Sequence, residues 1–181
     1  TATTTTSGLL TLGYQAGQAL TPTTTTAGNT VFGYQALNVA TSSNNNTAIG
    51  YQALKNSLDY LAYDNTAVGY QALTTNTIGR DNAAVGIRAL SANTAGSWNV
   101  AIGADVAGEN TTGAENVALG YGALYGNTTG DNNIAIGSNT GAGEWTTYSN
   151  RGGTYVGGYA GYKLQTGSDY NTLFGFKAGE D

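Results

Sequence analysis

Apolar and polar positions alternate along this chain in a short phrase that ends in glycine. The clearest copies, residues 46–54 and 65–73, differ only by Ile49 in one and Val68 in the other. Alternation over so few residues is typical of a short β-strand, and the glycine that follows it is typical of a turn. The phrase therefore predicts a strand closed by a glycine turn.

The glycine of this phrase recurs ten times, which identifies a repeat protein. The anchor glycines are Gly13, Gly33, Gly50, Gly69, Gly86, Gly103, Gly120, Gly137, Gly157 and Gly175. Five of the nine spacings are 17 residues and the other four are 18 to 20. Each copy is therefore expected to be one stacked coil that accepts insertions only in a loop. We predict an all-β protein, a parallel β-roll or β-solenoid of about ten coils with a 17-residue period.

The two faces of the predicted strand differ in side-chain size. The residue before each anchor glycine is large and apolar, as in Phe32 and Ile102, and we expect it to be buried. The opposite face carries alanine, as in Ala48 and Ala101. A strip this bare suits close approach of another backbone, across a thin roll or at the axis of an oligomer. Because the large residues can form a core within each chain, we favour a parallel trimer with the alanine strip as its interface.

A second phrase, Asn-Thr-x-Gly, begins at Asn76, Asn93, Asn110 and Asn127. Asn and Gly accept left-handed backbone conformations, so this phrase predicts the turn that leads to the next coil. Stacked copies should align Asn and Thr in ladders that hydrogen-bond between coils, and so should the Asn that opens each strand phrase. With a strand spacing of about 4.8 Å, the rod should be roughly 45 to 50 Å long.

Composition excludes several functions. The chain has no Cys and no His, which removes disulfides, the commonest zinc ligands and the usual general base. A net charge of −5 with six Lys and Arg offers no basic surface to nucleic acid. No apolar run approaches the roughly 20 residues of a membrane-spanning helix. We expect no cofactor, no metal, no nucleic-acid partner and no membrane insertion. Because we find neither a secretory signal nor an initiating Met, we expect a processed form or part of a longer protein.

The phrase also resembles known repeats. Asn-Val-Ala-Ile-Gly at residues 99–103 and Asn-Val-Ala-Leu-Gly at 116–120 resemble the repeat of YadA-type trimeric autotransporter adhesin heads. The fuller phrase, Asn-Thr-Ala-Val-Gly-Tyr-Gln-Ala-Leu, is similar to repeats in tail-fibre proteins of phages and phage-like particles. The resemblance implies a left-handed parallel β-roll, a homotrimer, and an extracellular setting on a cell surface or a virion tail fibre. The period is longer than in adhesin heads, which implies a larger connecting loop.

We therefore expect a structural rod of an extracellular trimeric fibre that spaces or presents a surface-binding region, and no enzyme. The acidic residues recur at no spacing that suits paired-carboxylate catalysis. One alternative is a monomeric solenoid that polymerises head to tail through unpaired strand edges into a surface filament. The aligned Thr residues leave an ice-binding solenoid as a further alternative, although the adjacent Gly favours a turn over a flat face.

The longest interruption of the period, residues 141–151, is the candidate ligand-binding loop. Trp145 and Tyr148 can stack on a sugar ring while Glu144 and Arg151 orient its hydroxyls, in adhesion to surface glycans or a host-cell receptor. The alternative, which we favour, is that these aromatic residues pack over the final coils. Trp98, in a shorter loop, has the same two interpretations.

Tyrosines that follow the anchor glycines, including Tyr51 and Tyr70, should stack at a corner of the roll, and we favour a chain interface there over an exposed adhesive stripe. Three Asn-x-Thr patterns, at Asn45, Asn110 and Asn127, are candidate glycosylation acceptors. We interpret residues 1–181 as a single repeat domain. Residues 1–28 form a Thr-rich cap with a first imperfect coil, 29–140 the regular coils, 141–152 the insertion, and 153–181 the last two coils.

Overall fold

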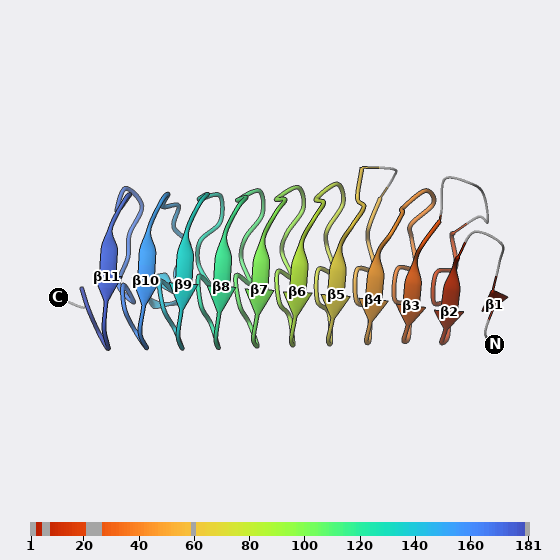
Figure 1. The fold of residues 1–181 in the computed structure, drawn as a ribbon, viewed down its shortest axis with the longest axis horizontal. Helices are drawn as coiled ribbons and strands as arrows, with labels where there is room; N and C mark the ends of the chain where they lie inside the picture. The colour runs from red at the N-terminus through yellow and green to blue at the C-terminus, as the bar shows by residue number, and fades with distance from the viewer. Residues whose placement is uncertain (1–2, 5–7, 21–26, 59–60, 180–181) are drawn as a thin grey trace.

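The computed structural model of the chain describes residues 3–4, 8–20, 27–58 and 61–179. These residues form a rod in which short strands lie side by side in one sheet, in the order of the chain (Figure 1). Strands β2 to β11 are parallel, and β1 pairs antiparallel with β2. The predicted all-β parallel solenoid is confirmed. The strands are β1 (Thr3–Thr4), β2 (Leu10–Leu12), β3 (Thr30–Phe32), β4 (Thr47–Ile49), β5 (Thr66–Val68), β6 (Ala83–Val85), β7 (Val100–Ile102), β8 (Val117–Leu119), β9 (Ile134–Ile136), β10 (Thr154–Val156) and β11 (Thr172–Phe174).

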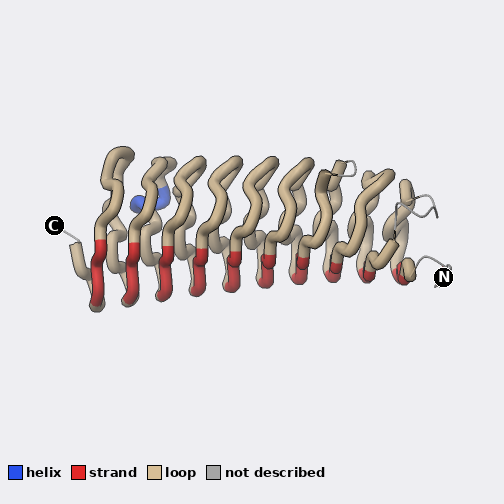
Figure 2. The backbone as a smooth tube through the Cα atoms, turned by 45° about the horizontal axis from the view of Figure 1, so that its top comes forward, coloured by secondary structure: helices blue, strands red, loops and turns tan. Residues whose placement is uncertain are grey.

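Equivalent residues of successive coils face one another across the sheet. Ala48 pairs with Ala67 and Ala84 pairs with Ala101, although the first step along the chain contains two residues more than the second. The extra residues therefore lie in loops away from the strands, as the tan segments of Figure 2 show. In the described part of the chain, no helix has the length and apolar character needed to cross a membrane.

The strand face that lies inside the roll is the one that carries alanine. Ala101 is 1% exposed, whereas Ile102 beside it is 43% exposed and Phe174 is 80% exposed. The prediction that the residue before each anchor glycine is buried is therefore wrong, and the alanine strip cannot be a chain interface. The reason is that leucines from the segment after the glycine turn, such as Leu73 and Leu90, are fully buried in the same thin interior.

These core leucines adopt an uncommon backbone conformation. Their φ angles are 45° at Leu37 and 50° at Leu54, Leu73 and Leu90, in the left-handed region. That region costs a residue with a side chain about 1–2 kcal/mol, and full burial of a leucine contributes about 1.5–3 kcal/mol. Burial thus offsets the backbone cost, and the turn directs each leucine into the core.

The anchor glycines stack too closely for any side chain. At Gly86 φ is 136°, and a Cβ atom there would overlap the carbonyl oxygen of Gly103 in the next coil. The same overlap recurs from Gly33 to Gly120 along the stack. Only glycine allows both this backbone conformation and this approach, which explains why it defines the period.

Two buried asparagine ladders run along the interior, as the sequence predicts. In the first, the Asn116 backbone N–H and side-chain Nδ2 both donate to Asn99 Oδ1, at 3.0 and 3.1 Å. In the second, Asn93 Nδ2 donates to Asn76 Oδ1 at 2.8 Å. These bonds satisfy amide groups that would otherwise be costly to bury, and each one fastens a coil to the coil before it.

The regular coils end at an insertion that contains a short 3₁₀ helix, η1 (Gly143–Trp145). Beyond it, Tyr155 occupies the inward strand position that alanine holds in the central coils, and its side chain is fully buried. At the other end of the chain, Thr5, Thr6 and Thr23–Thr26 of the predicted Thr-rich cap lie outside the described residues.

Candidate functional site

A ladder of polar side chains follows the anchor glycines along one corner of the rod. Gln35 Nε2 donates to Gln15 Oε1 at 2.8 Å. Gln52 and Gln71 each donate in the same way to the glutamine of the coil before. Arg88 and Asp105 then occupy the equivalent positions. Arg88 Nε and Nη2 donate to the two carboxylate oxygens of Asp105 at 2.6 and 2.8 Å, as a bidentate pair. The next position is Gly122, which has no side chain, so the ladder is interrupted there.

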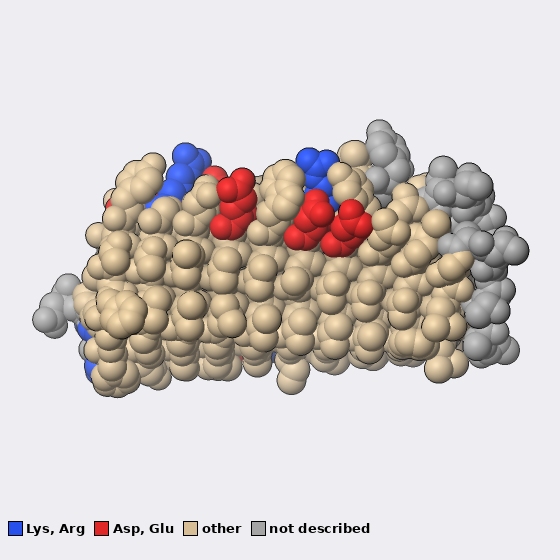
Figure 3. All heavy atoms as spheres, viewed as in Figure 1, with Lys and Arg blue, Asp and Glu red and all other residues tan. Residues whose placement is uncertain are grey.

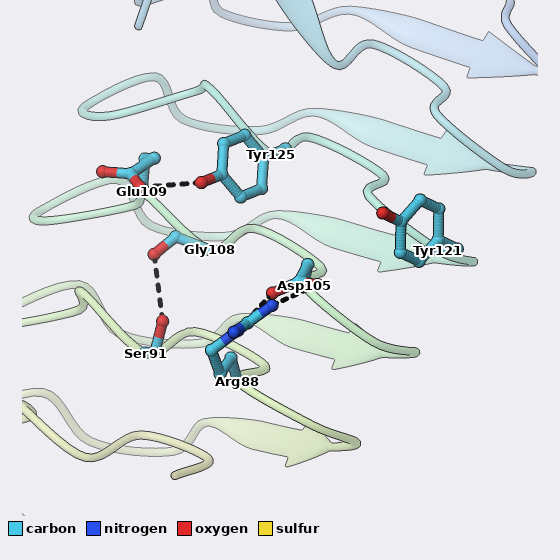
Figure 4. Close-up of a pocket in the computed structure, with 7 residues that line it drawn as sticks. All are labelled: Arg88, Ser91, Asp105, Gly108, Glu109, Tyr121 and Tyr125. Atoms are coloured by element: carbon cyan, nitrogen blue, oxygen red, sulfur yellow. Dashed lines mark hydrogen bonds and ion pairs between the residues drawn. The ribbon is translucent and has the colours of Figure 1, made fainter. Parts of the chain in front are cut away.

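A hollow of about 410 Å³ opens beside this ion pair (Figure 4). It is lined by Arg88, Ser91, Asp105, Gly108, Glu109, Tyr121 and Tyr125. The ring of Tyr125 lies over Gly108, where an added Cβ would come within 3.0 Å of Tyr125 Cε2. The Tyr125 hydroxyl donates to Glu109 Oε1 at 3.0 Å, which fixes the tilt of the ring. Tyr121 stands on the strand side of the hollow, and the ion pair lies on the adjacent coils below the two rings in the view of Figure 4.

Contacts within the hollow stabilise the charged form of Arg88 and the neutral form of Tyr125. The hydrogen bond and charge of Asp105 raise the pKa of Arg88, so the guanidinium stays charged. Burial, followed by the hydrogen bond to Glu109, raises the pKa of Tyr125, so the phenol stays neutral at physiological pH. Because one arginine faces two carboxylates, the lining carries a formal charge of −1.

A second surface feature is an outward row of apolar side chains, one from every parallel strand. It consists of Leu12, Phe32, Ile49, Val68, Val85, Ile102, Leu119, Ile136, Val156 and Phe174, which we call the outer strand row. In β7, β8 and β9 the first strand residue is also aliphatic and points outward. Two outward aliphatic side chains per strand thus follow one another over these three successive strands.

The predicted tyrosine stack borders this row. The rings of Tyr14, Tyr34, Tyr51 and Tyr70 follow one another with centroids 5.2 Å apart and nearly parallel planes. Each ring is exposed on its outer side. Ile87 takes the next position, so the stack ends at Tyr70. Tyr121 lies three coils beyond Tyr70, next to the hollow.

In the view of Figure 3, charged side chains gather along one edge of the rod, over the loops, and leave the broad face uncharged. Trp98 lies in one of these loops and is 49% exposed. The guanidinium of Arg80 sits 5.0 Å from the ring of Trp98 and 5.6 Å from that of Tyr63. Arg80 Nη1 also donates to the Tyr63 hydroxyl at 2.6 Å. One of the two faces of Trp98 is thus already used within the chain.

The structure separates Glu144, Tyr148 and Arg151, three of the four residues predicted to form a ligand-binding loop. Tyr148 is 4% exposed and its hydroxyl donates to the Gly141 carbonyl, so its ring belongs to the core and cannot stack on a surface sugar. Glu144 is exposed on η1, and the side chain of Trp145 lies outside the described part of the structure. Arg151 faces a different, smaller hollow of about 220 Å³, where its Nε lies 3.7 Å from Asp131 Oδ2.

The candidate glycosylation acceptors differ in access. Asn110 and Asn127 are buried in the second asparagine ladder, and Nδ2 of each donates to the carbonyl of the glycine three residues on. Neither amide is available for a glycan in the folded chain. Asn45 is exposed and remains the accessible acceptor pattern of the three.

The threonines that align along the rod use their hydroxyls internally. Oγ1 of Thr77, Thr94 and Thr111 donates to a backbone carbonyl of the next coil, at 2.8 to 3.0 Å. Ice binding needs an outward array of hydroxyls, which this arrangement does not favour. Among the described residues, no group of three or more acidic side chains is placed to hold a metal ion.

The fold and surface define the chain as a β-solenoid with an apolar outer face and a polar hollow. Searches against protein-family models, curated proteins and solved structures found no match.

Proposed function

We propose that this chain is the structural rod of an extracellular fibre in which three parallel copies associate along their length, and which spaces or presents a surface-binding region. The single observation that supports this proposal is the outer strand row, an unbroken line of apolar side chains on ten successive strands. Exposed apolar surface of this extent is typical of a face that is covered by a partner.

The form of the row favours a second copy of the same chain as that partner. Its residues repeat at the spacing of the coils, so only a surface with the same repeat can match it rung by rung. A parallel arrangement around a common axis places equivalent rungs at one level and closes the assembly. The face has few charges to desolvate. The number three rests on the resemblance to trimeric fibre repeats.

The tyrosine stack supports the same interpretation as a border of the interface. Tyr34, Tyr51 and Tyr70 each leave one edge of the ring outward, beside the outer strand row. Tyrosine is enriched at protein interfaces, because its ring gives apolar contact and its hydroxyl reaches water. The interface proposed from the sequence thus moves from the alanine strip to the opposite face of the strand.

The mechanical role follows from the direction of the hydrogen bonds. Strand pairs, both asparagine ladders and the glutamine ladder all join one coil to the next, parallel to the rod axis. A load along the axis is therefore shared by many hydrogen bonds in each coil. Such a rod can hold a binding region at a fixed distance from its base.

The test is the solution mass of the purified chain, measured by light scattering over a dilution series. The proposal predicts a constant mass near three times 18.4 kDa. The double variant Ile102→Asp/Ile136→Asp places charges in the outer strand row and should reduce the mass to that of one chain, because six carboxylates would be buried together. Thr112→Asp, at an exposed loop position, is the matched control and should stay trimeric.

Two results would contradict the proposal. A mass of 18.4 kDa for the unmodified chain at all concentrations would leave the outer strand row uncovered. A mass that grows steadily with concentration would favour the head-to-tail filament. Circular dichroism of the double variant separates loss of association from loss of folding, since both substituted side chains point outward.

A further inference from the structure

We infer that the hollow beside the Arg88–Asp105 pair is a binding site for an uncharged pyranose sugar. The inference goes beyond the proposed rod function, because all the residues that line the hollow come from one chain. It therefore does not depend on association of the chains.

The hollow results from a local change in the repeat. In the preceding coils the ladder position carries glutamine, and each glutamine bonds to the one before it. At coils β6 to β8 the same position carries Arg88, Asp105 and then Gly122. The change replaces a continuous ladder by an ion pair followed by a gap. The gap lies next to Tyr121, on the strand side of the hollow (Figure 4).

Two aromatic rings flank the hollow and set the shape of a ligand. The Cδ2–Cε2 edge of the Tyr125 ring lies next to Gly108, where any larger residue would push the ring outward. Its hydroxyl is held by Glu109, so the ring keeps this orientation without a ligand. Tyrosine rings that are fixed in advance suit the apolar C–H face of a pyranose, because no side-chain freedom is lost on binding.

The polar groups select the chemistry of the ligand. Asp105 and Glu109 accept hydrogen bonds from hydroxyl groups, and the exposed part of the Arg88 guanidinium donates them. Arg88 is already paired, and the lining as a whole is negative. An anionic ligand such as a phosphate, a sulfated sugar or a sialic acid would therefore meet repulsion. A neutral polyol has the donors and acceptors that match this set.

The volume agrees with this assignment. A hollow of about 410 Å³ lies in the range of small-molecule sites, although it is open at the surface. An open, polar hollow on the side of a rod suits one or two sugar units of a longer chain. In the proposed trimer three copies of the hollow at one level would compensate in part for the weak affinity expected of a single shallow site.

The experiment is calorimetric titration of the intact chain with neutral trisaccharides of glucose, galactose and mannose, and with sialylated and sulfated trisaccharides as anionic probes. At least one neutral trisaccharide should bind with a dissociation constant on the order of millimolar or tighter. Tyr125→Ala and Gly108→Ala should each weaken that binding by roughly tenfold or more. Glu109→Gln should weaken it by several fold, because an amide is a poorer acceptor than a carboxylate.

The variants are chosen so that a folding defect cannot imitate the result. Gly108→Ala retains every polar group and changes only the room beneath the Tyr125 ring. Thr74→Ala, at the position equivalent to Tyr125 in an earlier coil, is the matched control and should bind like the unmodified chain. The Ile102→Asp/Ile136→Asp variant should also bind, which separates this inference from the trimer proposal.

Several outcomes would overturn the inference. They are no heat of binding for any neutral sugar up to roughly 10 mM, binding of anionic sugars alone, or binding that Gly108→Ala and Glu109→Gln leave unchanged. Sugar binding that is lost in Trp145→Ala but retained in Tyr125→Ala, Gly108→Ala and Glu109→Gln would place the site in the insertion. That result would also overturn the assignment.

Discussion

The central and C-terminal coils fill the same interior with opposite arrangements of size. In the central coils the strand contributes alanine and the segment after the turn contributes leucine, as in Ala84 and Leu90. In the C-terminal coils Tyr155 takes the strand position and Gly161 takes the position of the leucine. A Cβ at Gly161 would come within 3.0 Å of Tyr155 Cδ1, so the glycine makes room for the ring.

An intermediate coil shows the same rule. Val106 and Ala107 stand where the other central coils have alanine followed by leucine, and both are buried. Valine and alanine together are one methylene group smaller than alanine and leucine, so most of the volume is retained while its distribution along the chain changes. In these coils the large side chain of the interior therefore comes either from the strand or from the segment after the turn.

The largest expected effect is the loss of stability when an anchor glycine is substituted. This loss should differ most between the central and the C-terminal coils. Gly86→Ala should lower the unfolding free energy by roughly 4 kcal/mol or more, because the new methyl group would overlap the Gly103 carbonyl and force the coils apart. Gly175→Ala keeps a similar φ of 122° but has no neighbouring atom within 4 Å. It should cost only the backbone strain, about 1–3 kcal/mol.

Urea unfolding followed by circular dichroism, at one protein concentration for both variants, measures this difference. Equal losses at Gly86 and Gly175 would mean that backbone conformation alone, and not contact between coils, makes glycine necessary. That result would also contradict the close stacking that we describe for the central coils.

A smaller effect tests whether Tyr155 and Gly161 replace the alanine and leucine of the central coils in filling the interior. Tyr155→Ala should cost about 3–5 kcal/mol, because it leaves a cavity beside Gly141 and Gly161. Adding Gly161→Leu to this variant recreates the central alanine and leucine arrangement. Gly161 has φ of 63°, close to the left-handed conformation of the core leucines. The double variant should therefore recover a substantial part of the loss.

Thermal unfolding of the two single variants and the double variant completes this cycle. Gly161→Leu alone should destabilise the chain, because Tyr155 already occupies the space. If the double variant is no more stable than the less stable of the single variants, leucine at position 161 does not fill the space left by Tyr155→Ala. The two regions would then not be interchangeable in how they fill the interior.

The sequence predicts the period, the strands, the anchor glycines and the asparagine ladders because each depends on contacts that repeat every coil. It does not predict which strand face is inside. Side-chain size favours Ile102 over Ala101 as the buried residue, and only the tertiary packing of Leu90 and its equivalents reverses that preference. A three-residue strand is too short for its own pattern to decide the matter.

The hollow is missed for a related reason. Asp105 and Glu109 resemble ordinary loop charges when they are considered one at a time. Alignment of the coils shows that Arg88, Asp105 and Gly122 occupy equivalent positions in successive coils, where earlier coils have glutamine. A departure from the repeat at one aligned position is the signal that sequence analysis can use. The burial of Tyr148 agrees with the interpretation favoured from the sequence, in which the aromatic residues of the insertion pack over the final coils.

The smallest expected effect sharpens the comparison at the Tyr155 hydroxyl. This group is buried and has no hydrogen-bond partner among the described residues, and burial raises the pKa of Tyr155 to about 12. Tyr155→Phe should therefore raise the unfolding free energy by about 1 kcal/mol at neutral pH. A gain here, beside a large loss for Tyr155→Ala, would show that the ring and not the hydroxyl fills the C-terminal core.

The pH dependence of the same residue has a definite sign. In the unfolded chain tyrosine ionises near pH 10, whereas the folded state keeps the proton to about pH 12. The contribution of the neutral phenol to stability is thus complete below pH 10 and is lost as the pH rises toward 12. Urea titrations at pH 8 and pH 11 should show a smaller decline for Tyr155→Phe than for the unmodified chain. An identical decline in both would mean that the hydroxyl reaches solvent, because a hydrated phenol ionises alike in the folded and unfolded states.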